Sequence, residues 1–397
     1  MKLEGPQVVE AHFRKTWAEI NLSAIKENYS LLLSTLGDRA GLCPMVKANA
    51  YGHGLIDVAK SLEYMEPVGF GVALVEEGIE LRQAGILTPI LVFATFDEIS
   101  LGACRKHQLT PVVSRKSEIE LLKSFFRDVG FHLKINTGMN RLGMDPALAK
   151  QVVGKATSLR NLVGLCTHLH SSADFYDKSS TSLAQLKIFA DYVDDVDGWN
   201  LAIHWGSSAP IISGYVLHGN PLDRVEEQIP SFTKSQMKFF RPGISLYGCS
   251  PTEKILSDLR PAMSLKSQIV HFQNLKRGEI VSYGGTFRAS KEMKIAVLPV
   301  GYGDGYLRCL SNKASVVVRE EVCPVVGRVC MDYLMISLEE HTQKDQLLIG
   351  ESVLLFGETN LGAQSAVRVE TLAYHANTIG YEVLTNINSR IPRRYTP

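Results

Sequence analysis

Lys47 is the first residue in the sequence whose position suggests chemistry. It ends a short apolar run, Leu42 to Val46, and the small, turn-forming residues of ANAYGHG follow it directly. If the run is a buried strand, the lysine stands where that strand leaves the core. Partial removal from water would lower the pKa of its ammonium group and let the amine form a Schiff base with a carbonyl compound. A lone lysine could also be an inert cation at the rim of the fold, so neighbouring motifs have to decide.

Two later segments carry groups suited to an anion. HWGSSAP (204–210) and RPGISLYG (241–248) each overlap or follow an apolar run. The paired serines supply hydroxyl donors, and Gly243 lets a backbone N–H approach a ligand closely. A lysine for a Schiff base, a phosphate site and Arg241 together favour an aldehyde cofactor with a phosphate tail, pyridoxal 5'-phosphate (PLP).

A regular alternation in the first two thirds of the chain predicts how these residues are positioned. Eight apolar, β-prone runs are separated for the most part by segments with helical spacing. The runs are 42–46, 68–74, 88–94, 109–114, 131–135, 162–169, 201–205 and 237–240. Eight such units indicate a parallel sheet closed into a (β/α)8 TIM barrel. Lys47 and both anion segments would then lie at the carboxyl ends of strands, where active sites of this fold are found.

The pattern changes after about residue 257. Short strands broken by Gly, Asp and Asn follow, among them KIAVLPV, ASVVVRE and SVLLF, with one helical stretch near 366–377. Such spacing is typical of a mainly β domain. We therefore predict an α/β protein of two domains, a PLP-binding barrel over residues 1–257 and a C-terminal β domain over 258–397.

Composition excludes several classes of function. The chain has 397 residues, of which 45% are hydrophobic and 21% charged, so it can bury two cores. Its net charge of +1 gives no attraction to nucleic acid or to an anionic membrane surface. No signal peptide or membrane-spanning run is visible. The seven cysteines include no CxxC pair, which argues against a disulfide framework and a metal site. We expect a cytoplasmic protein with a small-molecule substrate.

Six segments resemble motifs of the alanine racemase family, in the family's order and over nearly the whole chain. They are MVKANAYGHG (45–54), KINTGMNRLGM (134–144), RPGISLYG (241–248), VSYGGTF (281–287), VGYGDGY (300–306) and GRVCMDYLMI (327–336). The resemblance implies a homodimer of PLP-dependent barrels in which the partner subunit completes each active site. It also implies interconversion of L- and D-alanine, which supplies D-alanine for peptidoglycan.

The resemblance further implies two catalytic bases on opposite faces of the substrate Cα. Lys47 would hold PLP and act as the base for D-alanine, while Tyr283 of the other subunit would serve L-alanine. Two bases are needed because one fixed base would return the proton to the face it left. Tyrosine, with an ordinary pKa of about 10, needs positive charge or donated hydrogen bonds to act as a base. His168, between Tyr283 and Arg241, would provide that link.

The same resemblance assigns the remaining site residues. Arg241 would face the pyridine nitrogen of PLP and, because it keeps its own proton, leave that nitrogen unprotonated. The phosphate ligands would be Tyr51, Ser208, the backbone of Gly243 and Ile244, and Tyr381. Arg141 and the Met331 backbone of the partner would bind the substrate carboxylate. Tyr302, Arg308, Arg328 and Asp332 resemble the entrance layer, and Lys134 occupies a position that many family members carbamylate.

Two positions depart from the family pattern. Ser207 stands where many members have an asparagine, so its role as a second phosphate donor is open. Asn136 stands where an aspartate is common, which changes the local charge without touching a catalytic role.

A broad-specificity or serine racemase of the same family is the nearest alternative, because the size of a pocket does not follow from sequence. The absence of an export signal and the retention of Lys134 favour the alanine enzyme. A non-enzymatic PLP-binding barrel would lack the second domain and Tyr283. A Schiff-base aldolase would place its lysine late in the barrel, and a PLP decarboxylase would need an acidic group in place of Arg241.

Overall fold

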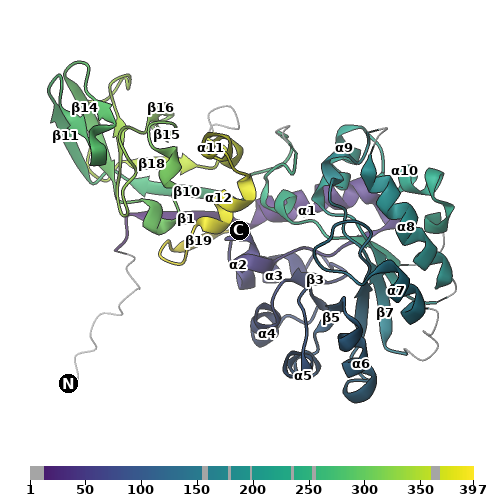
Figure 1. Ribbon diagram of the computed structural model, residues 1–397. Helices are drawn as coiled ribbons and strands as arrows, with labels where there is room; N and C mark the ends of the chain where they lie inside the picture. Colours follow the sequence, from purple (N-terminus) through teal and green to yellow (C-terminus); the bar gives the residue numbers. More distant parts are fainter. Residues whose placement is uncertain are drawn as a thin grey trace, which may run out of the picture. The chain divides into compact units, whose positions relative to one another are not determined.

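The computed structural model describes residues 13–153, 160–177, 180–196, 199–233, 237–252, 256–358 and 367–397. The chain divides into two compact units, each with its own sheet structure (Figure 1). One unit is Leu22–Arg260, called the barrel unit below. The other consists of Met1–Asn21 and Pro261–Pro397 and is called the β unit.

The barrel unit contains one eight-stranded parallel sheet. Its strands are β2 (Gly41–Leu42), β3 (Phe70–Val72), β4 (Ile90–Val92), β5 (Thr110–Val113), β6 (Phe131–Lys134), β7 (Leu162–Cys166), β8 (Ala202–His204) and β9 (Met237–Phe240). Their order is β2-β9-β8-β7-β6-β5-β4-β3. A parallel bridge between Met45 and Gly71 joins the two ends of this order, which closes the sheet. Seven of the eight predicted runs contain one strand each, and the first, 42–46, overlaps β2 at Leu42, so the predicted (β/α)8 barrel is confirmed.

Helices follow most strands of this unit and cover the sheet from outside (Figure 1). They are α1 (Leu22–Leu36), α2 (Lys47–Tyr51), α3 (Leu55–Glu63), α4 (Val75–Gln83), α5 (Glu98–Lys106), α6 (Lys116–Phe125), α7 (Pro146–Val153), α8 (Thr181–Asp195), α9 (Ser208–Val216) and α10 (Pro221–Gln228). Helix α8 shows why they pack as they do, because Leu183, Leu186 and Phe189 are buried at helical spacing. Among the helices that the structure describes, none is long and apolar enough to cross a membrane.

The interior of the barrel is mainly apolar but contains two histidines. A cluster of buried side chains from six strands or strand ends fills it: Cys43, Leu91, Val112, Cys166, Ala202 and Phe239. His132 of β6 and His204 of β8 are buried beside this cluster. Gly164 of β7 makes room for them, because a Cβ there would lie 2.3 Å from His132 Nδ1. Two imidazole rings therefore reach into a mainly apolar core.

The β unit is built on a six-stranded sheet of order β16-β15-β18-β10-β1-β19, with smaller sheets β11-β14-β17 and β12-β13. Its strands are β1 (Thr16–Asn21), β10 (Met263–Gln268), β11 (His271–Leu275), β12 (Ile280–Val281), β13 (Phe287–Arg288), β14 (Met293–Leu298), β15 (Ser315–Val318), β16 (Glu321–Pro324), β17 (Leu334–Ser337), β18 (Ser352–Phe356) and β19 (Arg393–Thr396). Its helices are α11 (Val369–Ala376) and α12 (Gly380–Asn386). The predicted helical stretch near 366–377 contains α11, and residue 366 lies outside the described residues.

The first strand of the chain belongs to the β unit. β1 pairs antiparallel with β10 and parallel with β19. This corrects the predicted barrel domain of residues 1–257, which includes β1. The alternating burial of β1, with Ala18 and Ile20 inward, instead suits a strand in the middle of a mixed sheet. The second boundary, at Arg260 and Pro261, lies close to the predicted change of pattern near residue 257.

Candidate active site

Lys47 begins a short turn with an unusual backbone. The four residues from Ala48 to Tyr51 have φ between 52° and 55°, in the left-handed region. Each non-glycine residue there costs about 1–2 kcal/mol relative to a right-handed conformation. Hydrogen bonds offset this strain, among them Gly52 N–H to Ala48 O at 3.0 Å and Ala48 N–H to Glu77 Oε1 at 2.6 Å. Strained backbone of this kind is concentrated at functional sites.

The surroundings of Lys47 favour its neutral amine. The side chain is half-buried, and desolvation lowers the pKa of its ammonium group. The positive charge of Arg141 lowers this pKa further, and Glu77 opposes the shift. A lysine with a lowered pKa is a better nucleophile and base near neutral pH.

Glu77 is a part of this site that the sequence analysis missed. Its Oε1 accepts from Ala48 N–H, and its Oε2 accepts from Ala73 N–H at 2.9 Å. Glu77 therefore ties the strained turn to the start of α4. Its only signal in the sequence is an acidic residue in the first turn of a predicted helix, which is common at helix starts.

Arg241 lies directly after β9, and its guanidinium is buried in the mouth of the barrel. Its Nη2 donates to Thr167 O at 2.8 Å and lies 3.4 Å from His168 Nδ1, while its Nη1 is bonded to His204 Nδ1. His204 Nε2 is 2.8 Å from His132 Nδ1. Because arginine can only donate, His204 Nδ1 must accept, and its Nε2–H then donates to His132. The result is a hydrogen-bonded chain with one direction, from Arg241 through His204 to His132.

Burial keeps all three histidines around Arg241 neutral. Desolvation, reinforced by the charge of Arg241, lowers the pKa of His132 and of His168 to about 3. The same causes lower the pKa of His204 well below its ordinary value. A neutral His168 whose Nδ1 faces a guanidinium has its proton on Nε2, which leaves an N–H donor for another group.

A second group of residues meets where α9 begins. Ser208 Oγ accepts from Gly243 N–H at 3.0 Å. Tyr51 Oη approaches the same glycine so closely that a Cβ on Gly243 would lie 2.3 Å from it. Ile244 begins the short 3₁₀ turn Ile244–Tyr247 next to them, and the buried Ser245 Oγ there has no hydrogen-bond partner among the described residues. The structure thus brings together four residues that the sequence analysis assigned to phosphate.

The loop after β6 holds Arg141 at an exposed position. A bridge between Ile135 and Met144 closes the loop, and Asn136 Oδ1 accepts from Asn140 N–H at 3.0 Å. Asn136 therefore provides the acceptor that an aspartate would provide here, without its charge. Gly143 has φ +147° and no space for a Cβ, which would lie 2.7 Å from Asn136 N.

Positive charge dominates this end of the barrel. Lys134 is buried, and desolvation together with Arg241, Arg141 and Lys47 lowers the pKa of its amine. Four basic side chains thus influence one another within one barrel mouth. Such a site suits a ligand with anionic groups, for example a phosphate and a carboxylate. Among the described residues, no three His, Cys, Asp or Glu side chains are grouped as they would be to hold a metal.

The remaining predicted residues lie in the β unit, mostly on its surface. Tyr283 begins the 3₁₀ turn Tyr283–Gly285 and is 73% exposed, and Met331 is 53% exposed. Their segments are joined, because Ser282 Oγ donates to Arg328 O at 2.8 Å. Tyr302 and Tyr333 are also exposed. Their segments are neighbours, because Tyr302 N–H donates to Cys330 O at 3.0 Å. Tyr381 lies on α12, and Arg308 is exposed.

Comparisons with known proteins agree on one family. The model described as "Alanine racemase, N-terminal domain" matches residues 20–251, and "Alanine racemase, C-terminal domain" matches 262–395. The alanine racemase of Halothermothrix orenii is 37% identical over 393 residues, covering 96% of this chain and 97% of the relative. The alanine racemase structure from Clostridium difficile 630 has a TM-score of 0.82 at 31% identity, covering 96% of both chains. That from E. faecalis has a TM-score of 0.82 at 30% identity, covering 97% of this chain and 99% of the other.

The neutral histidines of the barrel predict a loss of stability in acid. The folded-state pKa of His132, about 3, lies below the 6.5 of an unperturbed histidine, so below pH 6.5 the unfolded chain binds a proton that the folded chain excludes. Between pH 7.5 and 5.0 this costs about 2 kcal/mol per histidine. Urea unfolding midpoints at the two pH values should show a smaller acid loss in His132→Gln than in wild type, although the variant is less stable at pH 7.5.

The matched control for this comparison is His271→Gln, which changes an exposed histidine of the β unit. It should lose as much stability in acid as wild type does. If His132→Gln lost as much stability between pH 7.5 and 5.0 as wild type does, this would contradict the conclusion that His132 is neutral in the folded protein.

Proposed function

The chain belongs to the alanine racemase family and is an isomerase, and we propose that it interconverts L- and D-alanine with PLP and two bases, Lys47 and Tyr283. The observation that carries this proposal is the half-buried Lys47, whose pKa is lowered, in a barrel mouth with a buried Arg241. The two groups have the character needed at opposite ends of one cofactor, since one binds its carbonyl carbon and the other donates to its ring nitrogen.

The residues present fit PLP. Tyr51 Oη approaches position 243 so closely that only glycine fits there. The buried Ser245 Oγ, which has no partner among the described residues, lies in the same turn, so polar groups converge at this place. Tyr51, Ser208, the N–H groups of Gly243 and Ile244, and Tyr381 would hold its phosphate. When bound, PLP would supply a carbonyl carbon for amines and a conjugated ring that withdraws electrons from the substrate Cα.

Arg241 would set the protonation of the cofactor's ring nitrogen. Its bonds to Thr167 O and His204 Nδ1 fix the guanidinium. A guanidinium does not give up its proton, so it can only donate a hydrogen bond to that nitrogen. With Arg241 there in place of a carboxylate, the bound cofactor would withdraw electrons less strongly, which would favour return of the proton to Cα over side reactions.

The two proposed bases lie in different units of the fold. Lys47 would remove or return the proton on one face of Cα, and Tyr283 on the other. His168 has an Nε2–H that can donate to the Tyr283 phenolate and stabilise it. Tyr283, Tyr302, Met331 and Tyr333 form a largely exposed aromatic and apolar group, of the kind that protein interfaces cover. We therefore propose a homodimer in which each subunit donates Tyr283 to the barrel of its partner.

Arg141 and the Met331 backbone would bind the substrate carboxylate. The amine of Lys134 has a lowered pKa, and a neutral amine is the form that reacts with carbon dioxide. Carbamylation there would place an anion close to Arg141 and orient it. A broad-specificity or serine racemase of the same family remains the second candidate, because Arg141 and Met331 recognise a carboxylate that all amino acids share.

A role in the cytoplasm, in supplying D-alanine for peptidoglycan, is part of the same proposal. None of the seven cysteines, all of which lie in the described part of the chain, forms a disulfide, and five of them are buried, as suits a reducing compartment. A neutral small amino acid is also consistent with the near-zero net charge of the chain.

The first test is the visible absorption of the purified protein with PLP, followed by loss of optical rotation with L-alanine and then L-serine. Wild type should show the absorption band of lysine-bound pyridoxal, racemise alanine and act slowly on serine. Lys47→Ala should lose both the band and the activity, and Lys60→Ala, on the exposed side of α3, should keep both. A colourless wild type that leaves L-alanine unchanged would contradict the proposal.

Exchange of the alanine Cα hydrogen in D₂O tests the division of labour between the bases. Tyr283→Phe removes one base only, so racemisation should fall about a thousandfold. Lys47 should still exchange the Cα hydrogen of D-alanine without inverting it, and NMR should detect deuterated D-alanine. The control is Tyr374→Phe, which changes a tyrosine of α11 that is 82% exposed. Racemisation by Tyr283→Phe at the wild-type rate would exclude Tyr283 as a base.

A further inference from the structure

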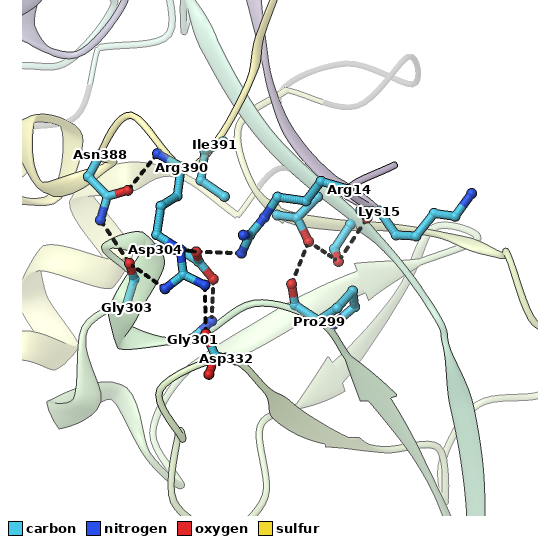
Figure 2. Close-up of polar contacts among 12 residues, drawn as sticks. Arg14, Lys15, Pro299, Gly301, Gly303, Asp304, Asp332, Asn388, Arg390 and Ile391 are labelled. Carbon is cyan, nitrogen blue, oxygen red and sulfur yellow. Dashed lines mark hydrogen bonds and ion pairs between the residues drawn. The ribbon is translucent and has the colours of Figure 1, made fainter. Parts of the chain in front are cut away.

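A buried carboxylate in the β unit has no part in the proposed chemistry. Asp304 ends the 3₁₀ turn Tyr302–Asp304 and is 1% exposed. Its Oδ2 accepts from Gly301 N–H at 3.1 Å, and its Oδ1 is ion-paired with Arg14 and with Arg390 Nε, the latter at 3.5 Å. Figure 2 shows the two guanidiniums converging on this side chain from either side. Removing one member of such a group is costly, because it leaves a buried charge without its partner.

Arg390 extends from this carboxylate to two other segments. Its Nη1 donates to Gly303 O at 3.1 Å, and its Nη2 donates to Asp332 Oδ1 at 2.7 Å. The planar guanidinium therefore bonds the turn that contains Tyr302 and the loop that contains Met331 at the same time (Figure 2). Asn388 supports the same arrangement, because its Nδ2 donates to Gly303 O at 2.9 Å.

The backbones of the two segments are in direct contact. Gly303 N–H donates to Met331 O at 2.8 Å, and Tyr302 N–H donates to Cys330 O at 3.0 Å. There is no room for side chains between them, because a Cβ on Gly301 would lie 2.2 Å from Cys330 O and one on Gly303 2.5 Å from Arg390 Nη1. The Met331 peptide is thus fixed by a neighbour that Arg390 and Asp304 hold in place.

We propose that Asp304 and Arg390 are positioning residues, which orient the Met331 backbone and Tyr302 for substrate binding by clamping the 301–305 turn to the 330–332 loop. This inference rests on the proposed function, in which Met331 of one subunit meets the substrate carboxylate in the barrel of its partner. Neither Asp304 nor Arg390 touches the substrate. Loss of either side chain would loosen the Met331 peptide, which does contact the substrate. Binding of alanine should therefore weaken more than turnover slows.

The test compares steady-state kinetics of alanine racemisation in wild type, Arg390→Gln and Arg390→Lys. Arg390→Gln should raise KM for alanine about tenfold and change kcat less than about threefold. Arg390→Lys keeps the positive charge but not the planar set of donors, so its KM should lie between those of wild type and Arg390→Gln. Asp304→Asn should shift KM in the same direction, and its double variant with Arg390→Gln should be no worse than the more affected single variant.

The matched control is Arg319→Gln. Arg319 also bridges a carboxylate and an amide in the β unit, with Nη2 to Glu351 Oε2 at 2.7 Å and Nη1 to Gln343 Oε1 at 3.1 Å. It should lower thermal stability to a similar extent as Arg390→Gln and leave KM unchanged. The Arg390 side chain is 45% exposed, so this variant can fold even where Asp304→Asn does not.

The outcomes separate the two proposals. A wild type that does not racemise alanine would overturn the proposed function, and this inference with it. An active wild type in which Arg390→Gln leaves KM unchanged, or in which Arg319→Gln raises KM as much, would overturn the inference alone.

Discussion

The bonding of the Arg241 guanidinium is the constraint on which the proposed site depends. A full positive charge in the barrel interior requires acceptors, and here these are Thr167 O and the neutral imidazole of His204. His204 accepts at Nδ1 because its proton lies on Nε2, and this Nε2–H donates to His132 Nδ1. The apolar layer of Cys43, Leu91 and Phe239 excludes water from this chain and so keeps both imidazoles uncharged. The packing of the barrel interior therefore determines the protonation of the histidines that bond Arg241.

The same charge also shapes the rest of the barrel mouth. Desolvation is the main cause that lowers the pKa of Lys47 and of Lys134. The charge of Arg141 lowers both further, and the charge of Arg241 also lowers the pKa of Lys134. The left-handed turn at Ala48–Tyr51 adds conformational strain at the same place. Lys47 thus has a lowered pKa and precedes a strained turn, which the hydrogen bond from Ala48 N–H to Glu77 helps to stabilise. An anionic cofactor and substrate would offset the repulsion among these basic groups.

The sequence predicts the barrel well because buried parallel strands appear as continuous apolar runs. Seven of the eight predicted runs contain the observed strands, and the first overlaps β2. It does not predict the turn after Lys47, because no residue from Ala48 to Tyr51 is a glycine, and positive φ there is stabilised by hydrogen bonds such as those to Glu77 Oε1 and Val46 O. The pairing of β1 with β10 was also missed, since it joins residues some 250 positions apart. His132 and His204 look like exceptions within apolar strands, and only the three-dimensional register shows that their rings meet.

The central claim is that each active site takes Lys47 from one subunit and Tyr283 from the other. Mixing inactive Lys47→Ala subunits with inactive Tyr283→Phe subunits, under conditions that allow exchange, tests it directly. If sites are shared, each mixed dimer holds one site with both changes and one with neither. Random pairing should then restore about a quarter of the wild-type racemase activity. If each subunit uses its own Tyr283, every site carries one change, and a mixture that stays inactive despite demonstrated exchange would contradict the account.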